Sequence, residues 1–342
     1  MVSQQPVCVV ISTGGTIASR YDALGVARPE VGSAELVQAA RGLEQFAWIE
    51  TVDCACVPSP HVGAEEWLQL HTAVSNAVSR PDVTGVVITH GTAVLEETAW
   101  FLDLTLCTDK PVVLTGAQRN ASEPDTDGPR NVRDAVRVAV SPNARQRGVL
   151  VVFNQRIIAA REVTKTHSFN VETFQSGERG FMGHTPPEGV TFYRDGGQRL
   201  HLPLRGRDLP AVEIVPMYAG ASDRLLRAAA QWAEGIVVQA VGAGHVNPAI
   251  YGAVADIIGA GTVVVVSTRI PQGGTRAGYG FIGSSRQLEQ AGAILSGALD
   301  AWKSRILLAL ALQNDADPKA VRQVFKEGSS CTSNHMEAHY DQ

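Results

Sequence analysis

The sequence predicts an α/β protein with two domains: a large N-terminal domain built on a mostly parallel β-sheet flanked by helices, and a smaller α/β C-terminal domain. Two observations predict this fold class. Short apolar runs alternate with longer stretches of helical periodicity, and the alternation resumes after a stretch rich in Gly and Pro. Alternating strands and helices form βαβ units with right-handed crossovers, so helices are expected on both faces of the sheet.

The elements of the N-terminal domain follow from this alternation. The apolar runs predict strands at residues 7–12, 49–57, 83–89, 111–115 and 148–153. The stretches between them predict helices at residues 33–40, 64–79, 94–104 and 130–140. Each helix lies between two strands, as a parallel sheet requires.

A composition change marks the second half of the chain. Gly, Pro and Arg crowd the stretch after Lys165 up to Pro210, which predicts a hairpin and then a linker. A second series follows, with strands at 211–217, 235–240 and 262–268 and helices at 222–233, 248–258, 298–312 and 318–325. We therefore expect an N-terminal domain at 1–190, a linker at 191–210, a C-terminal domain at 211–327 and a loose polar tail at 328–342.

Composition excludes several classes of partner. The 342 residues are 44% hydrophobic and 18% charged with a net charge of −5, so nucleic acid and anionic membranes are not expected as partners. We find no apolar run long enough to cross a bilayer and no secretory signal, which favours a cytoplasmic protein. The five cysteines lack paired metal-ligand spacing and are expected to be reduced. Cys331, His335 and His339 in the tail are expected to be a chance grouping, so neither a metal nor a cofactor is predicted.

Two threonine motifs follow apolar runs. They are Thr13-Gly14-Gly15-Thr16-Ile17-Ala18 and Thr89-His90-Gly91-Thr92-Ala93-Val94-Leu95-Glu96-Glu97-Thr98-Ala99. Parallel strands end at one edge of their sheet, where hydroxyl nucleophiles can be presented to a substrate. Gly14 and Gly15 lack a Cβ, which lets a substrate approach the backbone closely, and their spacing is not that of a dinucleotide or phosphate loop.

These motifs resemble the two threonine motifs of the bacterial-type L-asparaginase and glutaminase family. Other segments fall in the family's order and spacing: Thr115-Gly116-Ala117-Gln118-Arg119, Asp127-Gly128-Pro129, Gly148-Val149-Leu150-Val151-Val152 and Arg161-Glu162-Val163-Thr164-Lys165-Thr166. A weaker similarity extends to about residue 325. The resemblance implies the two-domain asparaginase-like fold and the hydrolysis of a carbon–nitrogen bond.

The resemblance also implies roles for single residues. Thr16 matches the threonine that attacks the carbonyl and becomes acylated, although a threonine there can also cap a helix. Thr92 and Lys165 match the pair that moves the proton, because a lysine pushed toward neutrality by burial can accept a proton through a threonine hydroxyl. Gly15 and Gly91 are expected to line the substrate, and the backbone N–H of Thr92 or Gly15 to stabilise the oxyanion.

One position departs from the family pattern. Ala93 stands where the second motif has an aspartate, which accompanies the lysine and binds the α-ammonium group of the substrate. A buried ammonium without an anion costs several kcal/mol, so asparagine is expected to be a poor substrate. Without a carboxylate beside it, Lys165 is expected to act as a base at lower pH. Val94 also replaces the usual threonine, which favours a natural divergent line over a single inactivating substitution.

The rest of the implied substrate pocket is also altered. Ser59 matches the serine that binds the substrate carboxylate, although a serine between two prolines is also an ordinary turn residue. Val26 stands where a tyrosine is usual, and Tyr21 in the same loop is expected to replace it in catalysis. His245 lies near the position of an amino-group ligand that a second subunit supplies, and the segment 273–281 offers no acidic residue.

Three functional hypotheses follow. The leading one is an amidohydrolase of this family that cleaves a small amide, or an imide, lactam or ester, without a free α-ammonium group. The second is a genuine L-asparaginase in which His245, His61 or water replaces the missing carboxylate. The third is a non-catalytic binding homologue, which the retention of Thr16, Thr92 and Lys165 disfavours. The resemblance further implies a homodimer or homotetramer with active sites shared between subunits.

Overall fold

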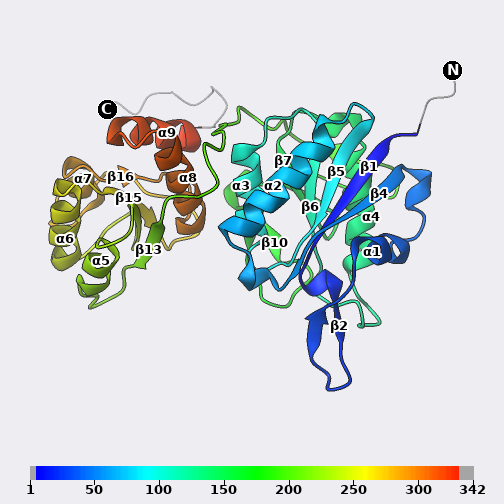
Figure 1. Ribbon diagram of the computed structural model, residues 1–342. Coiled ribbons are helices and arrows are strands. Elements are labelled where there is room, and N and C mark those ends of the chain that lie inside the picture. The colour runs from blue at the N-terminus through cyan, green and yellow to red at the C-terminus, as the bar shows by residue number, and fades with distance from the viewer. Residues whose placement is uncertain (1–4, 331–342) are drawn as a thin grey trace. The chain divides into compact units, whose positions relative to one another are not determined.

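The chain folds into two compact α/β units. The computed structural model describes residues 5–330, and these divide between Gly196 and Gly197. Each unit has its own sheet with helices on both faces, as the sequence predicts (Figure 1). The stretch predicted as a linker, 191–210, is shared between the units because its first residues pair with the sheet of the first unit.

The first unit contains an eight-stranded sheet in the order β12-β11-β8-β7-β6-β5-β1-β4. Five strands are parallel: β1 (Val7–Gly14), β4 (Trp48–Val57), β5 (Val83–Thr89), β6 (Val112–Thr115) and β7 (Val149–Phe153). Three more continue the sheet with antiparallel pairing: β8 (Arg156–Ala159), β11 (Gly183–His184) and β12 (Thr191–Phe192). The change of direction follows from the two-residue turn Asn154–Gln155, in which both residues have positive φ, as tight hairpins require.

Helices cover both faces of this sheet (Figure 1). α2 (Ala64–Ser79) and α3 (Leu95–Thr105) pack together on one face, and α1 (Ser33–Ala39) and α4 (Gly128–Ala139) pack on the other. Strand side chains alternate between the faces, so Val10, Val87 and Val113 join one core with Val132 and Val136 of α4. The four inner parallel strands β1, β5, β6 and β7 are buried on both faces, whereas the edge strand β4 is partly exposed. The carboxyl ends of all five meet at one edge.

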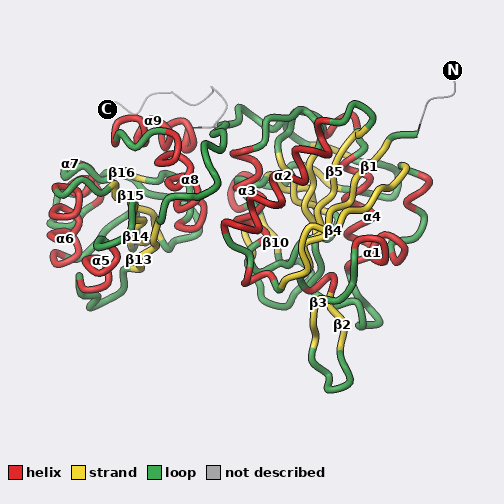
Figure 2. The backbone as a smooth tube through the Cα atoms, in the orientation of Figure 1, coloured by secondary structure: helices red, strands yellow, loops and turns green. Residues whose placement is uncertain are grey.

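Several short elements carry no signal in the sequence. β2 (Ser19–Tyr21) and β3 (Ala27–Pro29) form an antiparallel hairpin that projects from the sheet (Figure 2). β9 (Thr164–Lys165) and β10 (Phe174–Gln175) form a second small sheet. Strands of two or three residues are too short to show a period of two, so alternation cannot reveal them.

The second unit repeats the α/β architecture. Its four strands are parallel in the order β13 (Val212–Pro216), β14 (Gly235–Ala240), β15 (Val263–Thr268) and β16 (Ile294–Leu295). α5 (Arg224–Ala229), α6 (Pro248–Gly259) and α7 (Ser285–Gln290) pack on one side, and α8 (Ala301–Asn314) and α9 (Pro318–Ser330) pack on the other. α7 and β16 were not predicted.

The end of the chain differs from the prediction in one respect. α9 continues to Ser330, so residues 328–330 are helical where the sequence predicted a loose tail. The remainder of that predicted tail lies outside the described residues. Within residues 5–330, no helix is both long and apolar enough to cross a membrane.

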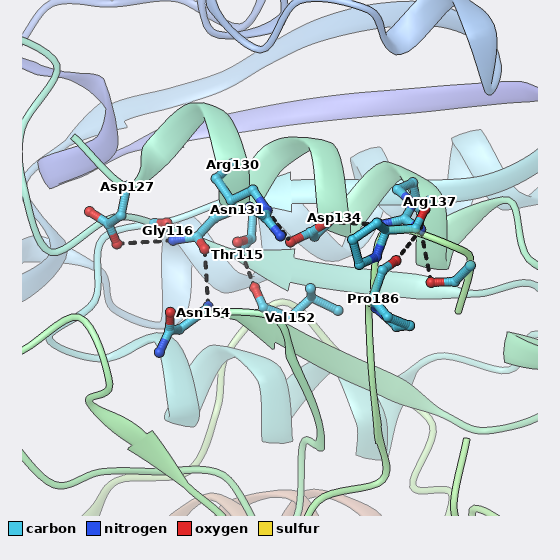
Figure 3. A network of polar contacts seen from close by, with 12 residues as sticks. Thr115, Gly116, Asp127, Arg130, Asn131, Asp134, Arg137, Val152, Asn154 and Pro186 are labelled. Carbon is cyan, nitrogen blue, oxygen red and sulfur yellow. Dashed lines mark hydrogen bonds and ion pairs between the residues drawn. The ribbon is translucent and has the colours of Figure 1, made fainter. Parts of the chain in front are cut away.

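A polar network fixes the loops that follow β6 and β7. Asn131 of α4 donates to Gly116 O and to an Asp127 carboxylate oxygen, each at 3.0 Å, and its Oδ1 accepts from Asn154 N at 3.0 Å (Figure 3). Farther along α4, Asp134 lies between Arg130 and Arg137, and Arg137 donates to Pro186 O at 2.6 Å. Asn131 is only 1% exposed, so it satisfies these backbone groups where water does not reach.

Replacing Asn131 with Ala is expected to lower the free energy of unfolding by about 3 kcal/mol, because buried backbone groups of Gly116 and Asn154 lose their partners. Urea denaturation followed by far-UV circular dichroism measures the loss. Asn76→Ala is the matched control, since Asn76 is exposed in the helix α2. Equal stabilities of the two variants would mean that the network contributes nothing to folding.

Candidate active site

Four neighbouring strands deliver polar side chains to one edge of the first sheet. The order β6-β5-β1-β4 is parallel, so the carboxyl ends of these strands are adjacent. The residues that follow them include Gln118 after β6, Thr92 after β5, Thr16 after β1 and Ser59 after β4. In open α/β sheets this edge is where ligands bind. The predicted presentation of Thr16 and Thr92 at one edge is therefore confirmed.

The two threonine motifs touch through their glycines. Gly15 has φ +79, and a Cβ built on it would lie 2.1 Å from Gly91 Cα. A Cβ on Gly91 would lie 2.4 Å from Ser59 Cβ. Only glycine permits this approach, which brings the residues after each glycine, Thr16 and Thr92, into the same part of the edge.

Thr16 begins a single 3₁₀ turn, Thr16–Ala18, and its side chain is half-buried. Its hydroxyl has no hydrogen-bond partner among residues 5–330. Gly15 precedes this turn without a side-chain cap, so Thr16 is not the N-cap residue that the alternative interpretation required. An uncommitted hydroxyl at a ligand-binding edge is what a nucleophile needs.

Lys165 completes a triangle of side chains. Its Nζ donates to Thr92 Oγ1 at 2.6 Å and to Gln118 Oε1 at 3.1 Å, and Thr92 Oγ1 donates to Gln118 Oε1 at 3.0 Å. Lys165 comes from β9, which lies outside the large sheet, and it is half-buried. The predicted pairing of Thr92 with Lys165 is thus present as a direct contact.

Burial controls the charge of this lysine. The pKa of Lys165 is lowered because its ammonium form is poorly solvated, and the Glu96 carboxylate opposes this by favouring the charged form. Glu96 lies in the first turn of α3, and its Oε2 accepts from the backbone N of Lys165 at 2.5 Å. The expectation that no carboxylate faces Lys165 is therefore wrong, although burial still dominates.

Sequence reasoning missed Gln118 and Glu96 as site residues. Gln118 lies just beyond the buried strand β6, which ends at the same edge as the two motifs, and this position is a usable signal. Glu96 falls in the second motif itself, but the motif alone does not indicate that this residue faces Lys165. The sequence cannot indicate that both residues contact Lys165, because Lys165 is 47 residues from Gln118 and 69 from Glu96.

A buried histidine supports the second motif. His90 is 1% exposed, its Nδ1 donates to Gly91 O at 2.7 Å, and its Nε2 accepts from the hydroxyl of Thr98 at 3.0 Å. Burial lowers the pKa of His90 to about 4. At neutral pH it is an uncharged ring that holds the Gly91 carbonyl in place.

Ser59 is bound to this motif as well. Its hydroxyl donates to Gly91 O at 2.8 Å and accepts from Val94 N at 3.1 Å, and the residue is 6% exposed. These contacts are those of a structural serine between two loops. A carboxylate-binding role for Ser59 stays a prediction. Ala93, next to the buried Thr92, is exposed and offers no polar group.

Two other predicted residues have contacts outside the triangle. The Tyr21 hydroxyl donates to Glu123 Oε1 at 2.6 Å, and this hydrogen bond raises the pKa of Tyr21. It therefore contacts a neighbouring loop and not the triangle. His245 belongs to the second unit, where its ring packs edge-on against Tyr279 and Phe281 and its Nδ1 accepts from Ser285 N at 3.2 Å.

One predicted oxyanion donor is corrected. The N–H of Gly15 donates to Val57 O at 3.0 Å, so it is already engaged in joining β1 to β4. The N–H of Thr92 has no partner among the described residues and stays available. Within residues 5–330, no three His, Cys, Asp or Glu side chains are grouped so that they could hold a metal ion. Cys331, His335 and His339 lie outside the described residues.

Comparisons with known proteins agree with this architecture. Residues 7–196 match the family described as "Asparaginase, N-terminal", and residues 211–325 match the "Glutaminase/Asparaginase C-terminal domain". The chain is 36% identical over 305 residues to an L-asparaginase of Bacillus licheniformis, covering 89% of this chain and 94% of that protein. It is 34% identical over 338 residues to L-asparaginase 2 of Escherichia coli, covering 94% and 93%.

A solved structure shows the same fold. The crystal structure of a probable cytoplasmic L-asparaginase from Campylobacter jejuni superposes with a TM-score of 0.86 at 32% sequence identity, covering 94% of this chain and 99% of that one. The predicted two-domain α/β fold is therefore confirmed, with a larger N-terminal and a smaller C-terminal sheet.

Proposed function

The chain belongs to the asparaginase and glutaminase family of amidohydrolases, and from this premise we propose that it hydrolyses a small amide other than asparagine with Thr16 as the nucleophile. The proposal rests on one contact above all, the 2.6 Å approach of Lys165 Nζ to Thr92 Oγ1. Half-burying a lysine costs desolvation free energy, and a protein that only binds has no need of such a lysine beside a hydroxyl. A purely binding role is therefore the weaker explanation.

The proposed reaction has two stages. Thr16 Oγ1 bonds to the amide carbon while its proton passes to the Thr92–Lys165 pair. Ammonia leaves with a proton from that pair, and an ester of Thr16 remains. A water molecule, deprotonated by the same pair, hydrolyses the ester and restores Thr16. The N–H of Thr92 is the candidate donor to the oxyanion.

The proposed substrate class follows from the charges available near Thr92. Ala93 supplies no anion for an α-ammonium group, and Glu96 is engaged by the backbone N of Lys165. An ammonium bound there would lose its hydration without gaining an ion pair. We therefore propose an amide, imide, lactam or ester that lacks this group.

L-asparaginase activity is the second candidate. It is favoured by the names of the relatives, since those from Bacillus licheniformis and Escherichia coli are both called L-asparaginase. In that case His245, His61 or water would have to take over the contact that Ala93 cannot make. Ser59 would then have to donate its hydroxyl proton to the substrate carboxylate instead of to Gly91 O.

Assembly and location are also proposals. We propose a homodimer or homotetramer in which His245 of a second copy contributes to the substrate pocket. A cytoplasmic location is in line with the name of the Campylobacter jejuni relative. Size-exclusion chromatography with light scattering measures the assembly state.

Ammonia release from two substrates tests the proposed function. One is L-asparagine, and the other is succinamate, which is the same molecule without its α-amino group. Thr16→Ala provides the blank. We expect release from succinamate that disappears in Thr16→Ala, with little release from asparagine. Asparagine turnover above that of succinamate would overturn the substrate assignment, and turnover that survives in Thr16→Ala would overturn the nucleophile.

Ala93→Asp is expected to shift this preference toward asparagine by about tenfold or more in kcat/KM, because the new carboxylate pairs with the α-ammonium group. The residue is exposed, so the substitution should not impair folding. Ala93→Asn is the matched control, of the same size and without charge. An unchanged preference in Ala93→Asp would show that the rest of the amino-group pocket, including His245 and the segment 273–281, has changed too.

A further inference from the structure

Gln118 occupies the place in the triangle where a charged partner of Lys165 could stand. Its Oε1 accepts from Thr92 Oγ1 at 3.0 Å and from Lys165 Nζ at 3.1 Å. A carbonyl oxygen has two lone pairs and can accept both hydrogen bonds at once. Gln118 is thereby in contact with both members of the proposed proton-transfer pair.

The orientation of the Gln118 amide is fixed at both ends. Its Nε2 donates to two backbone carbonyls, Asn170 O at 3.1 Å and His167 O at 3.4 Å. Carbonyl oxygens can only accept, so the amide nitrogen must face them and Oε1 must face Lys165. The backbone N of Gln118 donates to both carboxylate oxygens of Asp127, at 3.1 and 3.2 Å. The side-chain amide is thus held at both ends, and the backbone from which it projects is held by Asp127.

From this geometry we propose that Gln118 is a positioning residue for the reaction, which holds Thr92 and Lys165 together as an uncharged acceptor in place of a carboxylate. The proposal rests on the proposed role of Lys165 as a base. When Lys165 is neutral, Thr92 can turn its hydroxyl proton toward Nζ, while Gln118 Oε1 keeps accepting from an N–H of the amine. The acceptor therefore holds the lysine in both protonation states without stabilising the ammonium as strongly as an anion would.

Three other titratable residues contact members of the triangle. Glu96 of α3 faces Lys165 and is bound to its backbone N. Asp127, just before α4, is bound to Gln118 and to Asn131. His167 follows β9 and meets Gln118 through its backbone carbonyl. None of these places a charge at the position of Gln118 Oε1, so a carboxylate introduced there is a new charge next to Nζ.

Direct titration of Lys165 tests the proposal without any substrate. The chain has five lysines, so ¹³C NMR of protein labelled at lysine Cε gives few resonances, and Lys165→Met assigns the one of interest. In Gln118→Glu we expect the midpoint of Lys165 to rise by about one pH unit or more, because an anion now lies against its ammonium.

Gln175→Glu is the matched control in the same small sheet. The register pairs Lys165 with Phe174 and Thr164 with Gln175, so the side chains of Lys165 and Gln175 leave opposite faces. The expected midpoint in this variant is that of the wild type. A Gln118→Glu midpoint that does not exceed the Gln175→Glu midpoint would overturn the proposal.

A second variant separates positioning from folding. Gln118→Met keeps the length of the side chain and removes both the acceptor and the donors. We expect kcat to fall by about tenfold or more with KM little changed, since the reacting groups lose their alignment. An unchanged kcat would overturn the proposal. If the wild type hydrolyses none of the substrates, the proposed function fails, and the NMR titration still decides whether Gln118 sets the charge state of Lys165.

Discussion

Replacing Lys165 with Met is expected to lower kcat/KM by about a thousandfold, which is within the usual contribution of a positioned general base. The amine that accepts the Thr92 proton is lost, while the methionine fills a similar volume. Stability should not fall, because a half-buried charge is removed along with its hydrogen bonds. Steady-state kinetics on the best amide substrate and a thermal melt measure both effects.

Lys110→Met is the matched control for this variant. Lys110 is also half-buried, burial also lowers its pKa, and its Nζ donates to Arg80 O. It precedes β6, whereas the candidate site follows the carboxyl end of that strand. Its substitution should leave kcat/KM unchanged. Equal losses of kcat/KM in Lys165→Met and Lys110→Met would mean that Lys165 affects activity only through folding.

The same residue sets the expected pH profile. A base must be neutral to accept a proton, so kcat/KM should rise with pH around the pKa of Lys165 and level off above it. Because burial holds that pKa below the ordinary lysine value of 10.5, the midpoint of the rise should lie below pH 10.5. Measurement in a constant-ionic-strength buffer series tests this. A kcat/KM that does not change with pH would exclude Lys165 as the base.

Gly15→Ala is expected to cost more than about 3 kcal/mol of stability and at least about a hundredfold in kcat/KM. The new Cβ would lie 2.1 Å from Gly91 Cα and 2.4 Å from Gly91 N, which are backbone atoms without a flexible end to move aside. The two loops must separate, and Thr16 and Thr92 move apart with them. Chemical denaturation and kinetics measure the two losses.

Gly25→Ala isolates the steric part of this effect. Gly25 has φ +76, close to the +79 of Gly15, and nothing lies within 4 Å of a Cβ built on it. The variant pays only the backbone penalty of about 1–2 kcal/mol for a left-handed alanine. If Gly15→Ala were no worse than Gly25→Ala, the contact between the two motifs would not exist in solution.

The large elements of the fold could be predicted because their patterns are local. Val83–Thr89 and Ala64–Ser79 have the predicted bounds. A buried strand and an amphipathic helix each have a hydrophobic pattern that is contained within their own residues. The two-residue strand at Thr164–Lys165 could not be predicted, because it exists only through its partner Phe174–Gln175. Lys165 could be singled out from the sequence through its motif, and not through a local structural pattern.

The candidate site was predicted in part for the same reason. Thr16 and Thr92 follow strands with clear apolar patterns. Because parallel strands end at the same edge of their sheet, the sequence predicts that both residues lie at that edge. Gln118 was overlooked because glutamine is usually a solvated surface residue, and its contact with Lys165 spans 47 residues. For Ser59 the motif match predicts a contact with the substrate carboxylate, whereas the hydrogen bonds of its hydroxyl with Gly91 and Val94 could not be predicted from the sequence.

Thr92 and Ala93 are neighbours in sequence, yet the first is 5% exposed and the second lies open to water. In the proposed function, the loop after β5 thus separates two tasks by a single peptide bond: the side chain of Thr92 takes part in the reaction, and the exposed side chain of Ala93 borders the substrate. Random substitution at position 93 should yield folded proteins with differing substrate ranges. The same experiment at position 92 should yield inactive ones, so new specificity can evolve here without rebuilding the chemistry.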